Sequence, residues 1–361
     1  MRIEQVTATA YTVPTDAAEA DGTLAWDSTG MVLVTITAGD RSGIGWTYGP
    51  RACAWIVRDV LHDELVGGEP WDIPKLHSAM VAACRNLGQA GVASYAVSAV
   101  DVALWDLKAK ILQVPLHRLL GSAGERVAVY GSGGFTSYDT HVLVEQLRNW
   151  RDDRIPRVKI KVGENWGRAT ARDLERIALT RDVVGADCEV YVDANGAYGR
   201  KQAIRVAQAC GEARVTWFEE PVSSDDLVGL AQVRAAVRSD VAAGEYGTGA
   251  YYFRQMCAAQ AVDCLQADAT RCGGITGWLR AATIASSFGL QISGHCAPHV
   301  HVAVAGSVPN LRHLEWFHDH VRIESMFFDG VCSPTGGFIA PNNEPGLGLS
   351  FNEDEAEPYR V

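Results

Sequence analysis

Three carboxylates in the second half of the chain occur at equal intervals, each directly after a short apolar run. Asp193, Glu219 and Glu245 end the runs "VYVD", "TWFE" and "VAAGE", and successive members are 26 residues apart. If these runs are neighbouring parallel strands, the three side chains converge at the carboxyl ends of the strands. Hard oxygen ligands arranged in this way suit Mg²⁺. Each acid alone is equally compatible with a helix cap or an ion pair, so the prediction depends on the set.

Two lysines and a histidine precede and follow these acids. In "RVKIKVG" (157–163), Lys159 and Lys161 alternate with apolar residues, which is the period of a β-strand. A half-exposed strand would have its lysines in water, whereas a barrel strand would point them inward. Asp268 and His295 end the later runs "LQAD" and "SGH". A carboxylate bound to one imidazole nitrogen raises the basicity of the other, although a histidine satisfied in the core is the alternative interpretation.

The chemistry that this set fits is removal of a proton α to a carboxylate. The resulting enediolate carries two negative charges, which a divalent cation stabilises as a Lewis acid. Lys161 can act as a base near neutral pH only if its pKa is depressed, and Lys159 on the same face of the strand is expected to depress it. The lysines on the second strand and His295 on the seventh would lie on opposite sides of the acids.

The elements that must position these groups alternate short strands with amphipathic segments. The predicted strands are residues 127–134, 157–163, 188–195, 215–221, 241–246, 264–269, 291–296 and 313–317. Eight strands at intervals of roughly 20–30 residues, with helices between them, predict a (β/α)₈ TIM barrel. An open doubly wound sheet is the alternative, but "GSGGFTSY" is only a weak match to the Gly-rich phosphate turn of such a fold.

The chain is predicted to contain three segments. Residues 1–125 have two strand-like runs followed by helices and form an α+β capping domain, residues 126–317 form the catalytic barrel, and residues 318–361 lack the barrel periodicity. We expect this tail to return to the capping domain, which would then cover one end of the barrel.

Composition narrows the classes of partner. The net charge is −11 and no Lys/Arg run offers a stripe for phosphates, which argues against nucleic acid. No apolar segment approaches the ~20 residues of a membrane span, and the start of the chain does not resemble a signal peptide. Nine scattered cysteines, mostly with apolar neighbours, predict buried thiols in a reducing cytoplasm rather than a disulfide framework.

In combination, these motifs resemble the enolase superfamily, and within it the mandelate racemase subgroup. The matching stretches are "VKIKVG", "VDANGAY", "WFEEP", "AAGE", "QADATRCGGITGWL", "SGH" and "HLEW", in family order along the whole chain. Enolase-superfamily sites use a Lys or His base with Mg²⁺. The resemblance implies a modified barrel with the capping domain, and Asp193, Glu219 and Glu245 as Mg²⁺ ligands. It also implies Lys161 and His295 as acid/bases on opposite faces of the substrate.

The remaining roles follow from the same resemblance. Lys159 would lower the pKa of Lys161, Asp268 would orient His295, and Glu315, in protonated form, would donate a hydrogen bond to the substrate carboxylate. Asn195 is expected to support the metal ligands. Because Glu220 follows Glu219 in an alternating strand, one of these two acids is expected to face outward.

The resemblance implies several overall reactions. Dehydration of a sugar acid to a 2-keto-3-deoxy acid is the first choice, and racemisation, epimerisation or lactone cycloisomerisation with the same residues is the alternative. Substrate identity is expected to depend on residues 14–30 and 46–56 of the capping domain, where Trp26, Tyr48 and Arg51 are candidates. The resemblance also implies a homo-oligomer.

Two other functional classes fit the sequence less well. A metal-dependent hydrolase would use an HxH pair after the first strand, whereas His299 and His301 follow the seventh. A zinc site from Cys264, Cys272, Cys296 and His299 lacks the usual close cysteine spacing. A non-catalytic sugar-acid binding protein would have no use for both Lys161 and His295.

Overall fold

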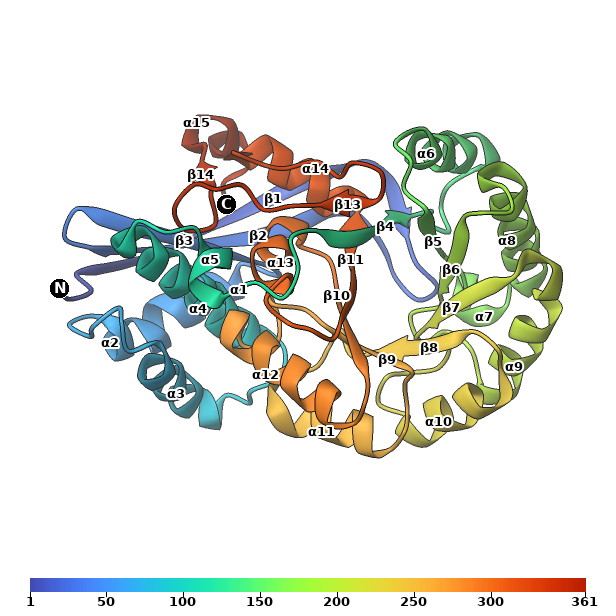
Figure 1. The fold of residues 1–361 in the computed structure, drawn as a ribbon, viewed down its shortest axis with the longest axis horizontal. Coiled ribbons are helices and arrows are strands. Elements are labelled where there is room, and N and C mark those ends of the chain that lie inside the picture. Colours follow the sequence, from blue (N-terminus) through green and yellow to red (C-terminus); the bar gives the residue numbers. More distant parts are fainter.

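The computed structural model describes residues 1–361. The chain begins with a three-stranded antiparallel sheet of β1 (Gln5–Ala20), β2 (Ala25–Ala38) and β3 (Arg41–Tyr48). The helices that follow are α1 (Ala52–Ile56), a π-helical turn (Val57–Leu61), α2 (His62–Leu65), α3 (Ile73–Ala83), α4 (Val92–Leu112) and α5 (Leu116–Leu120). This sheet and these helices make up the capping domain, which lies beside the barrel (Figure 1).

The sheet of the capping domain packs closely on the long helix α4. A Cβ atom added at Gly43 or Gly45 of β3 would lie 2.3 Å from a backbone carbonyl oxygen of α4, so only glycine permits this approach. The small residues of "VASYAVSAV" on the helix side complete the contact, and Ala96, Ala99 and Ala103 are buried. The pattern of small residues in the sequence therefore fixes the distance between sheet and helix.

Eight parallel strands form the barrel, and it closes on itself. The strands are β4 (Val127–Gly133), β5 (Arg157–Lys161), β6 (Glu189–Asp193), β7 (Val215–Glu219), β8 (Asp240–Ala243), β9 (Cys264–Ala267), β10 (Gln291–Gly294) and β11 (Leu311–Phe317). Each is hydrogen-bonded to the next in sequence, and β11 pairs with β4. The predicted closed barrel is confirmed, and each observed strand overlaps its predicted range.

Helices surround the barrel (Figure 1). They are α6 (Thr140–Asp152), α7 (Glu164–Gly167), α8 (Thr170–Val184), α9 (Arg200–Ala209), α10 (Leu227–Ala236), α11 (Gly249–Ala258), α12 (Gly274–Ser287), α13 (Pro298–Ala305) and α14 (His318–Phe327). Their buried faces and the barrel strands share one apolar cluster, and the inner part of the capping domain forms a second. No helix is long and apolar enough to cross a membrane.

After α14 the chain runs back to the capping domain. It includes β12 (Phe328–Asp329), β13 (Phe338–Ile339), β14 (Ser350–Phe351) and α15 (Glu353–Ala356). The Val361 amide donates to the Ala10 carbonyl of β1 at 3.0 Å, and the Leu347 amide donates to the buried carboxylate of Asp106 on α4 at 2.7 Å. The division of the chain into a capping domain of residues 1–125, a barrel of residues 126–317 and a tail of residues 318–361 stays a prediction.

A buried acid at the contact between capping domain and barrel makes stability depend on pH. Asp101 of α4 is fully buried and accepts the Thr276 amide of α12 at 2.9 Å. Burial raises the pKa of Asp101 to about 7. The folded protein therefore holds a proton that the unfolded chain releases near pH 4. This contribution to stability is complete below about pH 4 and is lost as the pH rises through about 7.

Asp101→Asn removes this titration and is expected to change the pH profile of unfolding. Between pH 4 and 8, the free energy of unfolding of the variant should rise relative to the wild type by on the order of a few kcal/mol. Urea unfolding across this range measures the difference. The exposed Asp40, which pairs with Arg41 at the surface, provides the control Asp40→Asn. The difference in free energy of unfolding between this control and the wild type should not change across the pH range. A flat difference for Asp101→Asn as well would contradict the assignment.

Candidate active site

Three of the predicted site residues lie in one row across neighbouring strands. Lys161 of β5 pairs in register with Asp193 of β6, and Asp193 pairs in register with Glu219 of β7. In-register residues of parallel strands point to the same side of the sheet, so these side chains lie next to one another at the carboxyl ends of the strands. The equal spacing in the sequence thus has a direct counterpart in the barrel.

Glu245 joins this row from the turn after β8. The preceding Gly244 has φ +132°, and a Cβ atom there would lie 2.2 Å from the Gln266 carbonyl oxygen, so glycine is required for the chain to turn. One carboxylate oxygen each from Asp193, Glu219 and Glu245 lies within 4.8 Å of the others, and all three residues are buried. Like charges this close require a compensating cation.

The two lysines point inward, and each is held by carboxylates. Lys159 Nζ lies 2.5 Å from Glu219 Oε1 and 2.7 Å from Glu315 Oε1, and Lys161 Nζ lies 2.5 Å from Asp193 Oδ2. Burial favours a lower pKa for Lys161, and Lys159 lowers it further, but Asp193 together with Glu245 and Glu315 raises this pKa above its ordinary value. Lys159 therefore lowers the pKa of Lys161 as expected, but the expected net depression is wrong for this arrangement, because the surrounding carboxylates raise this pKa by more.

His295 and Asp268 form the predicted pair on the other side of the acids. His295 Nδ1 lies 2.9 Å from Asp268 Oδ2, and His295 Nε2 lies 3.3 Å from Glu245 Oε2. Burial would raise the pKa of Asp268, but the hydrogen bond with His295 and the charge of Arg271 lower it to about 2. Burial would lower the pKa of His295, but the anionic groups around it, Glu245 among them, raise it. Lys161 therefore adjoins the acid cluster through Asp193, and His295 adjoins it through Glu245.

Glu315 is an ionised acceptor rather than the protonated donor that was expected. It accepts hydrogen bonds from Ser132 Oγ at 2.6 Å and from the Cys296 amide at 3.0 Å, in addition to its contact with Lys159. Burial alone would raise its pKa, but Lys159, His295 and Lys161 together hold the pKa of Glu315 well below its usual value. The sequence could not reveal this, because Lys159 and Glu315 are brought together only when the barrel closes.

Glu220 does not face outward, so the prediction for this pair of acids is wrong. Strand β7 ends at Glu219, and Glu220 adopts φ +37°, which ends the alternation. Glu220 is buried, its Oε1 has no hydrogen-bond partner, and burial with the nearby charge of Glu245 raises its pKa well above the usual value. The backbone N–H of Asn195 donates to Asp193 Oδ1 at 2.9 Å. The side-chain Oδ1 of Asn195 is buried and has no hydrogen-bond partner.

The three candidates from the capping domain differ in position. Tyr48 is buried, stacks on His320 at 3.3 Å between ring centroids, and donates to Glu324 at 3.1 Å, so its hydroxyl already has a partner in the barrel. Arg51 is exposed and packs on Trp55, with no ion pair to a carboxylate of the site. Trp26 is half-buried, and its indole N–H donates to Glu19 at 2.7 Å.

Sequence reasoning missed Arg271, which follows β9 in "DATR". Its guanidinium lies 3.3 Å from Glu245 and 3.4 Å from Asp268, and it packs between the rings of Tyr95 and Tyr246. Arg271 therefore links Glu245 of the acid cluster to Asp268, the residue that pairs with His295. Its position three residues after Asp268 was a usable signal, since it is the one cation near the end of that strand.

Two further neighbours of the site could not be found from the sequence. Ser132 at the end of β4 contacts Glu315, and the Cys296 thiol lies 3.4 Å from His295 Nε2. The first strand carries no ionisable residue at its end, so its sequence gives no chemical signal of a site residue.

The rival metal sites are not formed. His299 contacts Glu324 and the backbone of Cys332, and His301 accepts the Ala269 amide at 3.0 Å, so both histidines serve packing contacts of α13. The set of Cys264, Cys272, Cys296 and His299 does not come together as a group of potential ligands. All nine cysteines are free.

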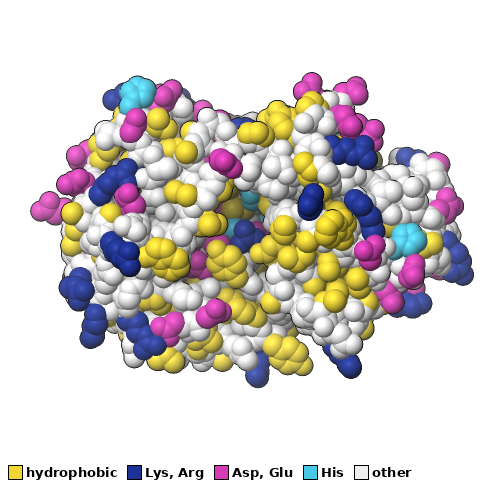
Figure 2. Space-filling model, turned by 180° about the vertical axis from the view of Figure 1, so that it is seen from behind, with side chains coloured by type: hydrophobic (Ala, Val, Ile, Leu, Met, Phe, Trp, Pro, Cys, Tyr) yellow, Lys and Arg dark blue, Asp and Glu magenta, His cyan; other side chains and the backbone are white.

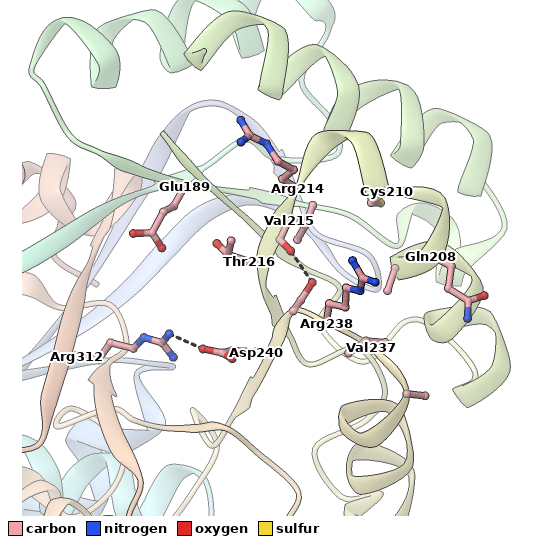
Figure 3. Close-up of a pocket in the computed structure, with 14 residues that line it drawn as sticks. Glu189, Gln208, Cys210, Arg214, Val215, Thr216, Val237, Arg238, Asp240 and Arg312 are labelled. Atoms are coloured by element: carbon pink, nitrogen blue, oxygen red, sulfur yellow. Dashed lines mark hydrogen bonds and ion pairs between the residues drawn. The ribbon is translucent and has the colours of Figure 1, made fainter. Parts of the chain in front are cut away.

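The site opens at one end of the barrel, and a separate cavity lies at the other. Figure 2 shows a hollow where acidic, basic and histidine side chains lie within an apolar rim. The other cavity, of about 850 Å³, is lined by residues that begin strands, among them Glu189, Val215, Asp240 and Arg312 (Figure 3). This cavity lies at the amino ends of the strands, the end associated with stability rather than catalysis in TIM barrels.

Comparison with known families decides the relationship. Residues 8–121 match the mandelate racemase/muconate lactonizing enzyme N-terminal domain, and residues 142–355 match the enolase C-terminal domain-like family. The chain belongs to the mandelate racemase/muconate lactonizing enzyme family. The predicted membership in the mandelate racemase subgroup of the enolase superfamily is thereby confirmed.

Relatives in this family act as lyases and isomerases. L-talarate/galactarate dehydratase of Salmonella typhimurium is 32% identical over 331 residues, covering 90% of this chain and 81% of the relative. D-galactarolactone cycloisomerase of Agrobacterium fabrum is 30% identical, covering 93% of both chains. The prediction that the protein is an enzyme of the lyase or isomerase type is confirmed.

Solved structures agree closely with the fold. A mandelate racemase/muconate lactonizing enzyme-like protein from Rubrobacter xylanophilus is 46% identical, covers 100% of both chains and has a TM-score of 0.96. A racemase from Streptomyces coelicolor A3(2) with bound magnesium is 28% identical, has a TM-score of 0.94, and the match covers 99% of this chain and 100% of that one. Homologous structures of the family thus contain magnesium, and this chain has a buried acidic cluster able to bind a metal.

Proposed function

We propose that the enzyme removes the proton α to the carboxylate of a sugar acid and then eliminates the β-hydroxyl, giving a 2-keto-3-deoxy acid. The observation that carries the proposal is the buried cluster of Asp193, Glu219 and Glu245, adjoined by Lys161 at one end and by His295 at the other. The dehydratase among the relatives supports dehydration of a sugar acid as the overall reaction.

The acid cluster fits a bound Mg²⁺. All three donors are carboxylates, which this hard cation prefers over nitrogen and sulfur. Burial raises the pKa of Glu219, and Asp193 and Glu245 add to the effect, so the cluster lacks positive charge even with Lys159 present. Asn195 Oδ1 is buried without a hydrogen-bond partner. When bound, Mg²⁺ would supply Lewis-acid stabilisation of the charge on the substrate carboxylate.

The protein's own residues move the protons. In its neutral form, Lys161 Nζ or His295 Nε2 accepts the α-proton, according to the face on which the substrate presents it. A cation held by Asp193 and Glu245 would favour the neutral forms, because it would offset the carboxylate charge that raises the pKa of both groups. Asp268 holds the proton of His295 Nδ1, which leaves Nε2 facing the acid cluster and the substrate. A protonated His295 then gives its Nε2 proton to the leaving β-hydroxyl, so that water departs rather than hydroxide.

The surrounding groups hold this arrangement in place. Lys159 connects Glu219 to Glu315, and Ser132 and the Cys296 amide fix Glu315 in turn. We infer that Lys159 and Glu315 position the metal ligands and balance their charge rather than transfer protons. Arg271 would have the same role for Glu245 and Asp268.

Cycloisomerisation of a sugar-acid lactone is the second candidate, because the named cycloisomerase matches this chain over 93% of both lengths. It would begin with the same α-proton removal and differ in the bond that breaks next. Racemisation or epimerisation would return a proton to the α-carbon from the opposite side.

The nine free thiols further support a reducing cytoplasm as the location of the protein. The family resemblance supports a homo-oligomer.

Incubation with Mg²⁺ and a library of aldonic, aldaric and uronic acids and their lactones in D₂O tests the proposal. NMR of the mixtures should reveal a new 2-keto product with deuterium at C3, because the enol formed by loss of the β-hydroxyl takes its new proton from solvent at that carbon. A ring-opened product without loss of water would favour the cycloisomerase. Absence of exchange and product across the library, together with Zn²⁺-dependent ester or amide hydrolysis, would refute both candidates.

A further inference from the structure

A second group of potential metal ligands lies where the β1–β2 hairpin meets the end of β11. Asp16 and Glu19 are on β1, and His318 is the first residue of α14. One ligand atom from each of the three lies within 4.8 Å of the others, and His318 Nε2 is 2.9 Å from Asp16 Oδ2. None of these residues takes part in the proposed reaction.

Glu19 has an unsatisfied oxygen in this group. The residue is only 1% exposed, and its Oε2 accepts the indole N–H of Trp26 at 2.7 Å. Its Oε1 is buried and has no hydrogen-bond partner. An unpartnered buried carboxylate oxygen is costly, so the site lacks a cation or donor that would complete it.

The charges nearby do not supply that cation. Arg322 is the nearest guanidinium, but it lies 2.6 Å from Asp319 Oδ1 and also donates to the Pro14 carbonyl at 2.8 Å. Asp319 accepts a second hydrogen bond from the Thr29 hydroxyl. Asp16 and Glu19 are therefore left with His318, and burial together with Asp319 raises the pKa of Glu19 to about 8.

We propose that Asp16, Glu19 and His318 bind a divalent transition-metal ion, for which Zn²⁺ is the best match. One imidazole nitrogen and two carboxylate oxygens are ligands of Zn²⁺, whereas Mg²⁺ prefers oxygen alone. Asp16 and His318 are partly exposed, with 45% and 29% of their side chains accessible, so water can complete the coordination. This site therefore differs from the buried cluster of three carboxylates in its chemistry as well as its position.

The ion would fasten the hairpin to the barrel. The hairpin already contacts the loop after β4, where the Thr136 amide donates to the Ala20 carbonyl at 2.8 Å and the Ser137 hydroxyl donates to the Ala18 carbonyl at 2.6 Å. A metal held by β1 and by the residue directly after β11 adds an attachment on the neighbouring strand. Metal binding would thus stabilise the position of residues 14–27 over the barrel.

Equilibrium dialysis with Zn²⁺, in excess Mg²⁺ to occupy the acidic cluster, tests the proposal on the full chain. His318→Gln and Asp16→Asn should each raise the Kd of one Zn²⁺ by at least about 10- to 100-fold, the range found when only an outer partner of a metal ligand is lost. His62→Gln is the matched control, because His62 lies 3.0 Å from the exposed Asp63 with no buried acid. Asp16 is exposed, so its variant does not disturb the core.

A second readout is thermal stability. Saturating Zn²⁺ should raise the Tm of the wild type and of His62→Gln, but not that of His318→Gln or Asp16→Asn. Zn²⁺ binding and Tm shifts in His318→Gln and Asp16→Asn equal to those of His62→Gln would overturn the proposal, whatever the outcome for the catalytic reaction.

Discussion

Lys161→Met and His295→Asn should each lower kcat for the overall reaction by about 10²- to 10⁴-fold, the usual contribution of a positioned acid or base. Lys161 is within 2.5 Å of Asp193, and His295 is within 3.3 Å of Glu245, so both groups adjoin the cluster on which the substrate carboxylate would be centred. After Lys161→Met, Asp193 still has Lys159 at 3.6 Å. After His295→Asn, Arg271 still lies 3.3 Å from Glu245 and 3.4 Å from Asp268, so neither change leaves a carboxylate without a nearby cation.

Matched controls separate chemistry from folding. The exposed Lys201 and His141 lie on helices outside the barrel, so Lys201→Met and His141→Asn should keep wild-type activity. Steady-state kinetics on the acid found by the library, with circular dichroism as the folding check, gives the comparison. A kcat for folded Lys161→Met or His295→Asn within the range of the controls would remove that residue from the mechanism.

Glu219→Gln should weaken Mg²⁺ binding by at least about 100-fold and lower activity at moderate Mg²⁺ in the same proportion, because it removes one of three converging charges. Lys159 keeps its contact with Glu315 at 2.7 Å, so the barrel should still fold. Isothermal titration calorimetry with Mg²⁺ and EPR with Mn²⁺ measure the binding directly.

The same variant should lose metal-dependent stabilisation. Wild-type protein at Mg²⁺ of 100 times Kd gains about 2.7 kcal/mol against unfolding, and Glu219→Gln at the same concentration should gain far less. The exposed Glu212 gives the control Glu212→Gln, which should behave as the wild type. Unchanged Mg²⁺ affinity in Glu219→Gln, or full activity after rigorous treatment with EDTA, would contradict the assignment of the three carboxylates.

Much of the arrangement could be predicted because it depends on periodicities within single strands. The alternation in "RVKIKVG" places both lysines on one face, and the shared spacing of the acids places Asp193 and Glu219 in register. The residue at which a strand ends can also be recognised from the local sequence. Because all the barrel strands are parallel, their carboxyl ends lie at one rim, and Glu245, Asp268 and His295 meet there. These predictions required only that the barrel closes.

The predictions that failed concern contacts between distant segments. The protonation of Glu315 and the pKa of Lys161 are set by carboxylate–ammonium contacts that form across the barrel, and sequence spacing does not give those distances. Glu220 was assigned outward because alternation was extended one residue beyond the end of β7, where the backbone turns to positive φ. Contact of Tyr48 with the substrate stays a prediction, and the hydrogen bond of its hydroxyl with Glu324, 276 positions away, is a further contact that spacing does not give.

The most direct measurement of the central claim is α-proton exchange in D₂O by the two single variants, on an acid that the wild type exchanges. The claim is that Lys161 and His295 serve opposite faces of one substrate bound at the acid cluster. For a given configuration at the α-carbon, exchange should therefore survive in one variant and be lost in the other. Exchange that is retained by both variants, or lost by both, would contradict the claim.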